Sequence, residues 1–170
     1  MRIGVLYVAL SIIIIVGLTG CLGSRRSELP TSETGFPIGA VRIYDGVTIQ
    51  FGMTRSEVGE VVQRLDIRTG EVIEEESTWF QVIYDNSIII HYLEEKVVLI
   101  GFVTEEWAIA YGIYVGDDIQ SVLENSAFNI YNHNDDMVEL ADDLQNPEFL
   151  ISLTYDRDGE ITSIVLVKLF

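Results

Sequence analysis

The chain has 170 residues, of which 27 are acidic and 10 are basic, and its formal net charge at pH 7 is −17. A chain this acidic has no basic stripe that could displace counterions from phosphates, which excludes nucleic acid as its main partner. Its one cysteine excludes an internal disulfide. The length is sufficient for one domain with a proper core.

The chain opens on an apolar leader. Met1-Arg2 is a short cationic start, and an almost unbroken apolar run follows it. This run of roughly 16 residues is short for a spanning helix, which usually needs about 20. A cationic tip, an apolar core and then small residues, in that order, are typical of the signal peptide of an exported chain.

The leader ends in Leu18-Thr19-Gly20-Cys21, which resembles the lipobox of bacterial and some archaeal lipoproteins. The resemblance implies that the Cys21 thiol is joined to diacylglycerol and that the chain is cut between Gly20 and Cys21. The chemistry agrees, because a lone exposed thiol is a liability in an exported protein. The alternative is an uncleaved signal anchor with an incidental cysteine.

We therefore expect a signal peptide over 1–20 and a flexible tether over 21–37, because the latter is rich in Ser, Thr, Gly and Pro and has no hydrophobic periodicity. The acidic body is repelled by anionic headgroups, so acyl chains rather than charge would hold it to the membrane. The expected location is the extracytoplasmic face of the cell membrane, or the outer membrane in an organism that has one.

A ten-residue pattern occurs twice, as Ile49–Val58 and, 64 residues later, as Ile113–Val122. Each copy predicts a short strand, a sharp turn at glycine and a capped helix. In the first copy Thr54-x-x-Glu57 has the form of a capping box. In the second copy Asp117 or Asp118 is the expected cap.

Runs of apolar and β-branched residues follow each helix. They predict strands at 77–84, 87–93, 97–103, 127–132, 148–155 and 160–169. The stretch from Met137 to Leu144 is left open between a helical and an extended piece. The predicted fold class is α+β, with two tandem helix-plus-antiparallel-β-meander repeats at 38–106 and 107–170.

Over about 46–170 the chain resembles the SmpA/OmlA (BamE-like) family, which includes a small lipoprotein of the outer-membrane β-barrel assembly machine. The resemblance lies in Gly52-Met53-Thr54 opening a helix with Val58 in it, then a strand with Trp79, then strand, acidic turn and Val strand. The tandem layout is also similar to the β-lactamase inhibitory protein and to paired repeats beside secreted CAP domains. These resemblances imply a fold and a protein-binding role in the envelope.

Catalytic motifs are scarce. His91 and Ser87 are four residues apart on one strand, which puts them roughly 13 Å apart and out of hydrogen-bond reach. His91 is therefore expected to be a satisfied, half-buried histidine, and His133 to be solvated in a loop. We predict no enzyme activity, no cofactor and no metal site, with Asp156 and Asp158 as weak calcium candidates that a hairpin turn explains as well.

Several strands, such as 97–100 and 164–167, are apolar without alternation, so both faces of the sheet need a cover. The favoured cover is the other repeat; the alternative is a partner. The residues proposed for partner contact are the aromatic ones that are enriched in interfaces, although core packing explains each of them too: Trp79, Tyr84, Tyr92, Trp107, Tyr111 and Tyr114.

The sequence therefore predicts a lipid-anchored, non-enzymatic envelope lipoprotein that binds or scaffolds an unknown envelope protein. The alternative function is a lipoprotein that binds calcium or a cationic peptide through its acidic loops.

Overall fold

The computed structural model describes residues 40–43, 47–76, 79–105, 107–109, 112–125 and 128–170. The predicted signal peptide, the tether and the Gly20-Cys21 junction lie outside the described residues. Within these ranges, the structure contains no helix long and apolar enough to cross a membrane.

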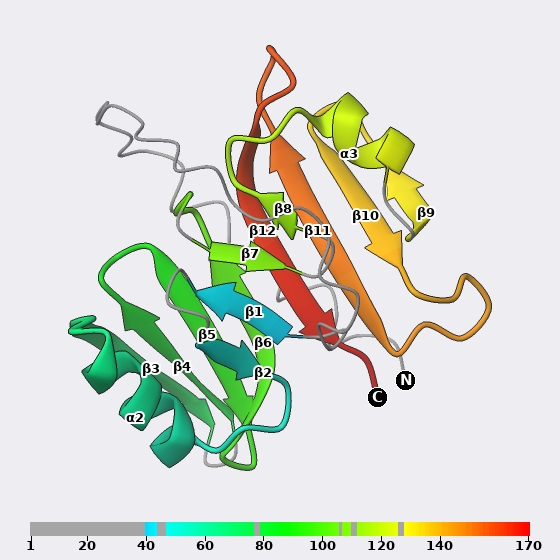
Figure 1. Cartoon of the computed structure of the whole chain (residues 1–170). Helices are drawn as coiled ribbons and strands as arrows, with labels where there is room; N and C mark the ends of the chain where they lie inside the picture. The colour runs from blue at the N-terminus through cyan, green and yellow to red at the C-terminus, as the bar shows by residue number, and fades with distance from the viewer. Residues whose placement is uncertain (1–39, 44–46, 77–78, 106, 110–111, 126–127) are drawn as a thin grey trace. The chain divides into compact units, whose positions relative to one another are not determined.

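The described strands form two antiparallel sheets, one of four strands and one of eight (Figure 1). The small sheet has the order β2-β1-β7-β8, and the large sheet has the order β3-β4-β5-β6-β12-β11-β10-β9. The small-sheet strands are β1 (Ala40–Ile43), β2 (Thr48–Gln50), β7 (Trp107–Ile109) and β8 (Ile113–Tyr114). The large-sheet strands are β3 (Thr69–Glu76), β4 (Trp79–Tyr84), β5 (Ile88–Leu93), β6 (Lys96–Phe102), β9 (Asn129–His133), β10 (Met137–Ala141), β11 (Phe149–Tyr155) and β12 (Ile161–Lys168).

The predicted α+β class, with its two tandem helix-plus-meander repeats, is wrong. Strands dominate the described part of the chain, and its two helices, α2 (Arg55–Arg64) and α3 (Ile119–Asn125), have only 10 and 7 residues. Strand pairing also crosses between the halves, since β6 pairs with β12 and β1 pairs with β7. The result is a β-sandwich-like fold rather than two repeats.

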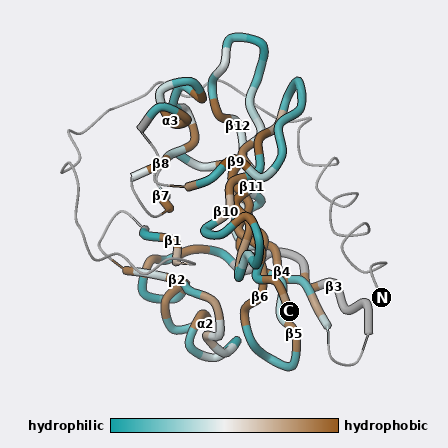
Figure 2. The backbone as a smooth tube through the Cα atoms, turned by 90° about the vertical axis from the view of Figure 1, so that its right-hand side faces the viewer, coloured by the Kyte–Doolittle hydropathy of each residue, from teal (hydrophilic) through white to brown (hydrophobic). Residues whose placement is uncertain are grey.

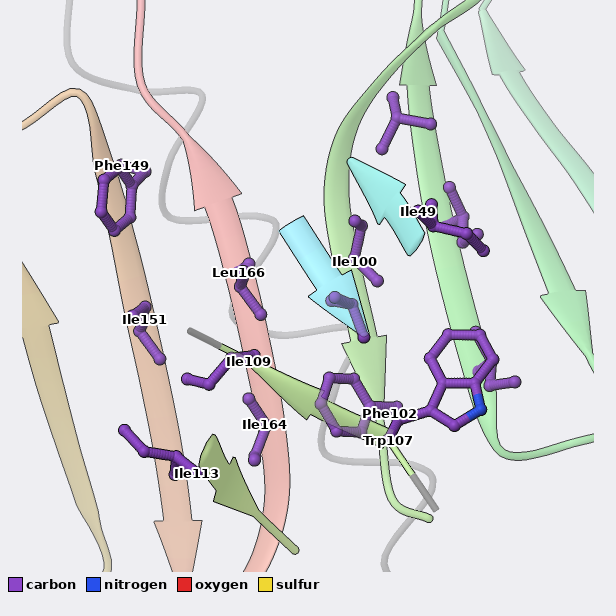
Figure 3. Close-up of a cluster of buried hydrophobic side chains, with 14 of the residues drawn as sticks. Ile49, Ile100, Phe102, Trp107, Ile109, Ile113, Phe149, Ile151, Ile164 and Leu166 are labelled. Atoms are coloured by element: carbon purple, nitrogen blue, oxygen red, sulfur yellow. The ribbon is translucent and has the colours of Figure 1, made fainter. Parts of the chain in front are cut away.

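The main core lies between the two sheets (Figure 3). β6 and β12 contribute apolar side chains that face the small sheet, and β7 and β8 contribute the side chains opposite them. Phe102 and Trp107 meet there, with ring centroids 5.9 Å apart. The labelled residues of this cluster are all at most 6% exposed: Ile49, Ile100, Phe102, Trp107, Ile109, Ile113, Phe149, Ile151, Ile164 and Leu166.

Both helices and the small sheet lie on the same side of the large sheet (Figure 2). The two halves do not stack face to face, because β6 and β12 join them edge to edge into one sheet. The expectation that one repeat covers the second face of the other is therefore wrong. On the non-alternating strand β12, Val165 is paired with Gly101 and lies on the face of the large sheet away from Ile164 and Leu166.

The predicted capping box of α2 is confirmed. The Thr54 hydroxyl accepts from the Glu57 backbone N–H at 3.3 Å, and the Glu57 carboxylate accepts from the Thr54 N–H at 2.7 Å. These bonds to Thr54 lower the pKa of Glu57. In α3 the cap is Asp118, whose carboxylate accepts from the Ser121 N–H at 2.8 Å.

The two predicted glycine turns have the same geometry. Gly52 and Gly116 adopt φ values of +84° and +91°, which favour glycine. The Gly52 N–H donates to the Val97 carbonyl at 2.9 Å, and the Gly116 N–H donates to the Ile161 carbonyl at 2.7 Å. Each turn thereby fastens the start of a helix to the last strand of its own half.

We expect Ile164→Ala to lower the free energy of unfolding by about 2–5 kcal/mol, because it leaves a cavity where β12 meets the small sheet. Ile164 is 0% exposed. Ile130→Ala is the matched control, since Ile130 is 49% exposed, and it should cost less than about 1 kcal/mol. Urea unfolding measures both, and equal losses would contradict this core assignment.

Candidate functional site

The aromatic residues predicted to contact a partner differ in how deeply they are buried. Tyr84, Tyr92 and Trp107 are 4%, 0% and 3% exposed and belong to the core. Trp79 and Tyr114 are partly exposed, and a contact role for them stays a prediction. Tyr111 lies outside the described residues.

Two of the buried tyrosines connect the neighbouring strands β4 and β5. The hydroxyl oxygens of Tyr84 on β4 and Tyr92 on β5 are 3.3 Å apart. The Tyr92 ring stacks on Phe80, with centroids 4.8 Å apart. Burial raises the pKa of Tyr92, so its hydroxyl stays protonated. These aromatic residues therefore pack in the core and link β4 to β5.

His91 is more deeply buried than the sequence indicates. It is 4% exposed, and its Nδ1 atom has no hydrogen-bond partner. The Trp79 ring meets it edge-on, with centroids 4.7 Å apart, and Gln81 is its cross-strand neighbour on β4. Desolvation lowers the pKa of His91 to about 4, so the imidazole is neutral at pH 7.

The weak metal candidates at the β11–β12 hairpin form a turn. The Asp156 carboxylate accepts from the backbone N–H groups of Asp158 at 2.9 Å and Glu160 at 3.0 Å. Gly159 follows with φ +85°. The part of the chain described by the structure contains no group of three or more His, Cys, Asp or Glu residues placed to hold a metal ion.

His133 ends β9 and is tied to β11 across the intervening strand β10. Its Nε2 atom lies 3.1 Å from the Tyr155 hydroxyl, and that hydroxyl donates to the Asn134 carbonyl at 2.8 Å. Because the hydroxyl has one hydrogen, His133 Nε2 must be the donor in this pair. The contact fixes the end of β9 against the sheet.

Strand β9 is exposed along its whole length and lies at one end of the large sheet. All five of its residues are exposed, and Ile130 and Tyr131 are each 49% exposed. It is the last strand in the sheet order, so no described strand pairs with its outer edge. The sequence predicted a strand here but not its edge position, and neither Ile130 nor Tyr131 was among the predicted contact residues.

Two side-chain bonds hold β9 to its neighbour. Asn129 donates its amide hydrogen to the Asp142 carbonyl at 3.1 Å, and Asn132 donates to the Glu139 carboxylate at 3.2 Å. The register of β9 with β10 shifts once, beside Tyr131. The structure thus presents β9 as an exposed sheet edge that contains no Asp, Glu, Lys or Arg and is bonded to the rest of the sheet along one side.

A scan against protein-family models and a search of curated proteins both find no match. Among solved structures, the chain is similar to an extracellular protein containing an SCP domain from Bacillus anthracis str. Ames, with 9% sequence identity and a TM-score of 0.47. The match covers 85% of this chain and about half, 50%, of that one. Neither value is high enough to assign a fold family or a function.

Because His91 is buried, the stability of the fold should depend on pH. The unfolded chain takes up a proton at His91 near pH 6.5, whereas the folded chain does so only near pH 4. The contribution of His91 to stability should therefore fall by about 3 kcal/mol as the pH drops from 6.5 to 4.

His91→Phe should remove this part of the pH dependence, while His133→Phe should retain it, because that variant leaves His91 in place. Urea unfolding of the three proteins at a series of pH values measures the difference. A wild-type curve parallel to that of His91→Phe would rule out the desolvated histidine.

Proposed function

We propose that this chain is a lipid-anchored, non-enzymatic lipoprotein of the cell envelope whose β body binds another envelope protein. The observation that carries the anchoring is the sequence Leu18-Thr19-Gly20-Cys21 after an apolar leader. The thioether uses the one thiol of the chain, and the acyl chains provide the membrane affinity that a body of this charge lacks.

Strand β9 supports the protein-binding part of the proposal. A sheet edge without Asp, Glu, Lys or Arg and with two half-exposed side chains, Ile130 and Tyr131, is a template for strand addition. The resemblance to the SmpA/OmlA (BamE-like) family, stated above for 46–170, is compatible with such a role in the envelope.

The anchor is tested by metabolic labelling of the producing cells with a palmitate analogue. We expect the native chain to incorporate the label and Cys21→Ser to incorporate none, because the hydroxyl forms no thioether in this modification. Ser24→Ala, beside the junction, is the control and should label normally. Label in Cys21→Ser, or none in the native chain, would defeat the anchor.

Protein binding is tested in the same cells with a photo-reactive benzoylphenylalanine at position 131 of the full chain. We expect a discrete cross-linked adduct with a second protein, because Tyr131 is half-exposed on the β9 edge. The matched control has the same residue at position 103, since Val103 is 38% exposed and follows β6. No adduct at 131, or the same adduct at both positions, would contradict binding at β9.

A further inference from the structure

The two edges of the large sheet differ in charge. β3, at one edge, has four glutamates among its eight residues. β9, at the other edge, has none among its five. β9 therefore lacks the charged residues that oppose the addition of another strand to a sheet edge.

Acidic pairs flank β9 at both of its ends. Asp135 and Asp136 follow the strand in the turn to β10, and both are exposed. Asp142, whose carbonyl accepts from Asn129, lies beside the start of β9, and Asp143 is next to it. A five-residue strand spans roughly 17 Å, so an extended segment on β9 would have carboxylates near each end.

We propose that the outer edge of β9 binds an extended, cationic segment of the partner protein by strand addition. This inference rests on the proposed protein-binding role and names its partner class. Main-chain hydrogen bonds to the β9 edge would supply affinity, and Ile130 and Tyr131 would contact alternate side chains. Lysine or arginine at both ends of the segment would meet the flanking aspartates.

A second copy of this chain fits the edge poorly. An antiparallel pairing of two β9 strands would put Asp135 and Asp136 of one copy beside Asp142 and Asp143 of the other, at both ends. Like charges placed opposite each other weaken strand pairing. Each copy also has a net charge of −17, which adds long-range repulsion.

The test uses the protein as purified from the producing cells in neutral detergent and a fluorescein-labelled peptide of nine residues. This peptide has two lysines at each end and alternating valine and threonine between them. A second peptide has proline in place of both threonines, which keeps the charge but prevents ladder hydrogen bonds. A third has glutamate in place of all lysines. Fluorescence anisotropy measures binding at low and at raised salt.

We expect the lysine peptide to bind, more weakly at raised salt, and the proline and glutamate peptides to bind at least about tenfold more weakly. Tyr131→Lys should weaken binding of the lysine peptide by about tenfold or more, because it puts a cation on the β9 edge. Val103→Lys adds the same charge four strands away, roughly 19 Å, and should change binding less than about twofold.

Amide hydrogen exchange on the wild-type protein tests the same binding without requiring that a substituted protein folds. Exchange at residues 129–133 should slow when the lysine peptide is added, and exchange at β3 should not. Equal binding of the proline peptide, equal binding by Tyr131→Lys, or dimerisation of the protein through β9 would each overturn the inference. Loss of acylation or of cellular cross-links would overturn the proposed function without affecting these readings.

Discussion

The ladder between β6 and β12 is the constraint on which the rest of the structure depends. It joins the last strand of each half through four paired positions, from Ile164 opposite Phe102 to Val167 opposite Leu99. The residues that this ladder turns toward the small sheet, Ile100 and Leu166 among them, are 0–2% exposed. Because β6 and β12 lie at the centre of the large sheet, the other strands of each half extend outward from them. The first strand after each helix, β3 after α2 and β9 after α3, is therefore an edge.

The position of the ladder therefore decides which strands the protein can offer to a partner. β3 and β9 are edges because they are the strands furthest from β6 and β12. β9 contains no Asp, Glu, Lys or Arg, and Asn132 and Asn129 bond it to Glu139 on β10 and to Asp142 just after β10.

Local features of the fold could be predicted from the sequence, and long-range ones could not. The capping box at Thr54 and the turns at Gly52 and Gly116 depend on residues a few positions apart, which a sequence displays directly. Strands such as Ile88–Leu93 were placed within two residues. β3 was missed because glutamate is depleted in strands, and β7 because its three residues are too few to show a period.

The fold class failed for a related reason. The apolar runs of β6 and β12 indicate burial on both faces, but nothing in either run says that the two strands pair with each other. The aromatic residues show the same limit. Tyr84, Tyr92 and Trp107 have the residue types of an interface, and they fill the core, because a core selects large apolar rings as strongly as an interface does.

The acidity of the chain is consistent with both parts of the proposed function. A net charge of −17 keeps the body away from anionic headgroups, so an acylated Cys21 would hold it near the membrane without laying it on the surface. The same field attracts a cationic segment over a range of about 8 Å at physiological salt. That range is shorter than the β9 strand, so the aspartates at its ends, rather than the remote glutamates, would select the segment.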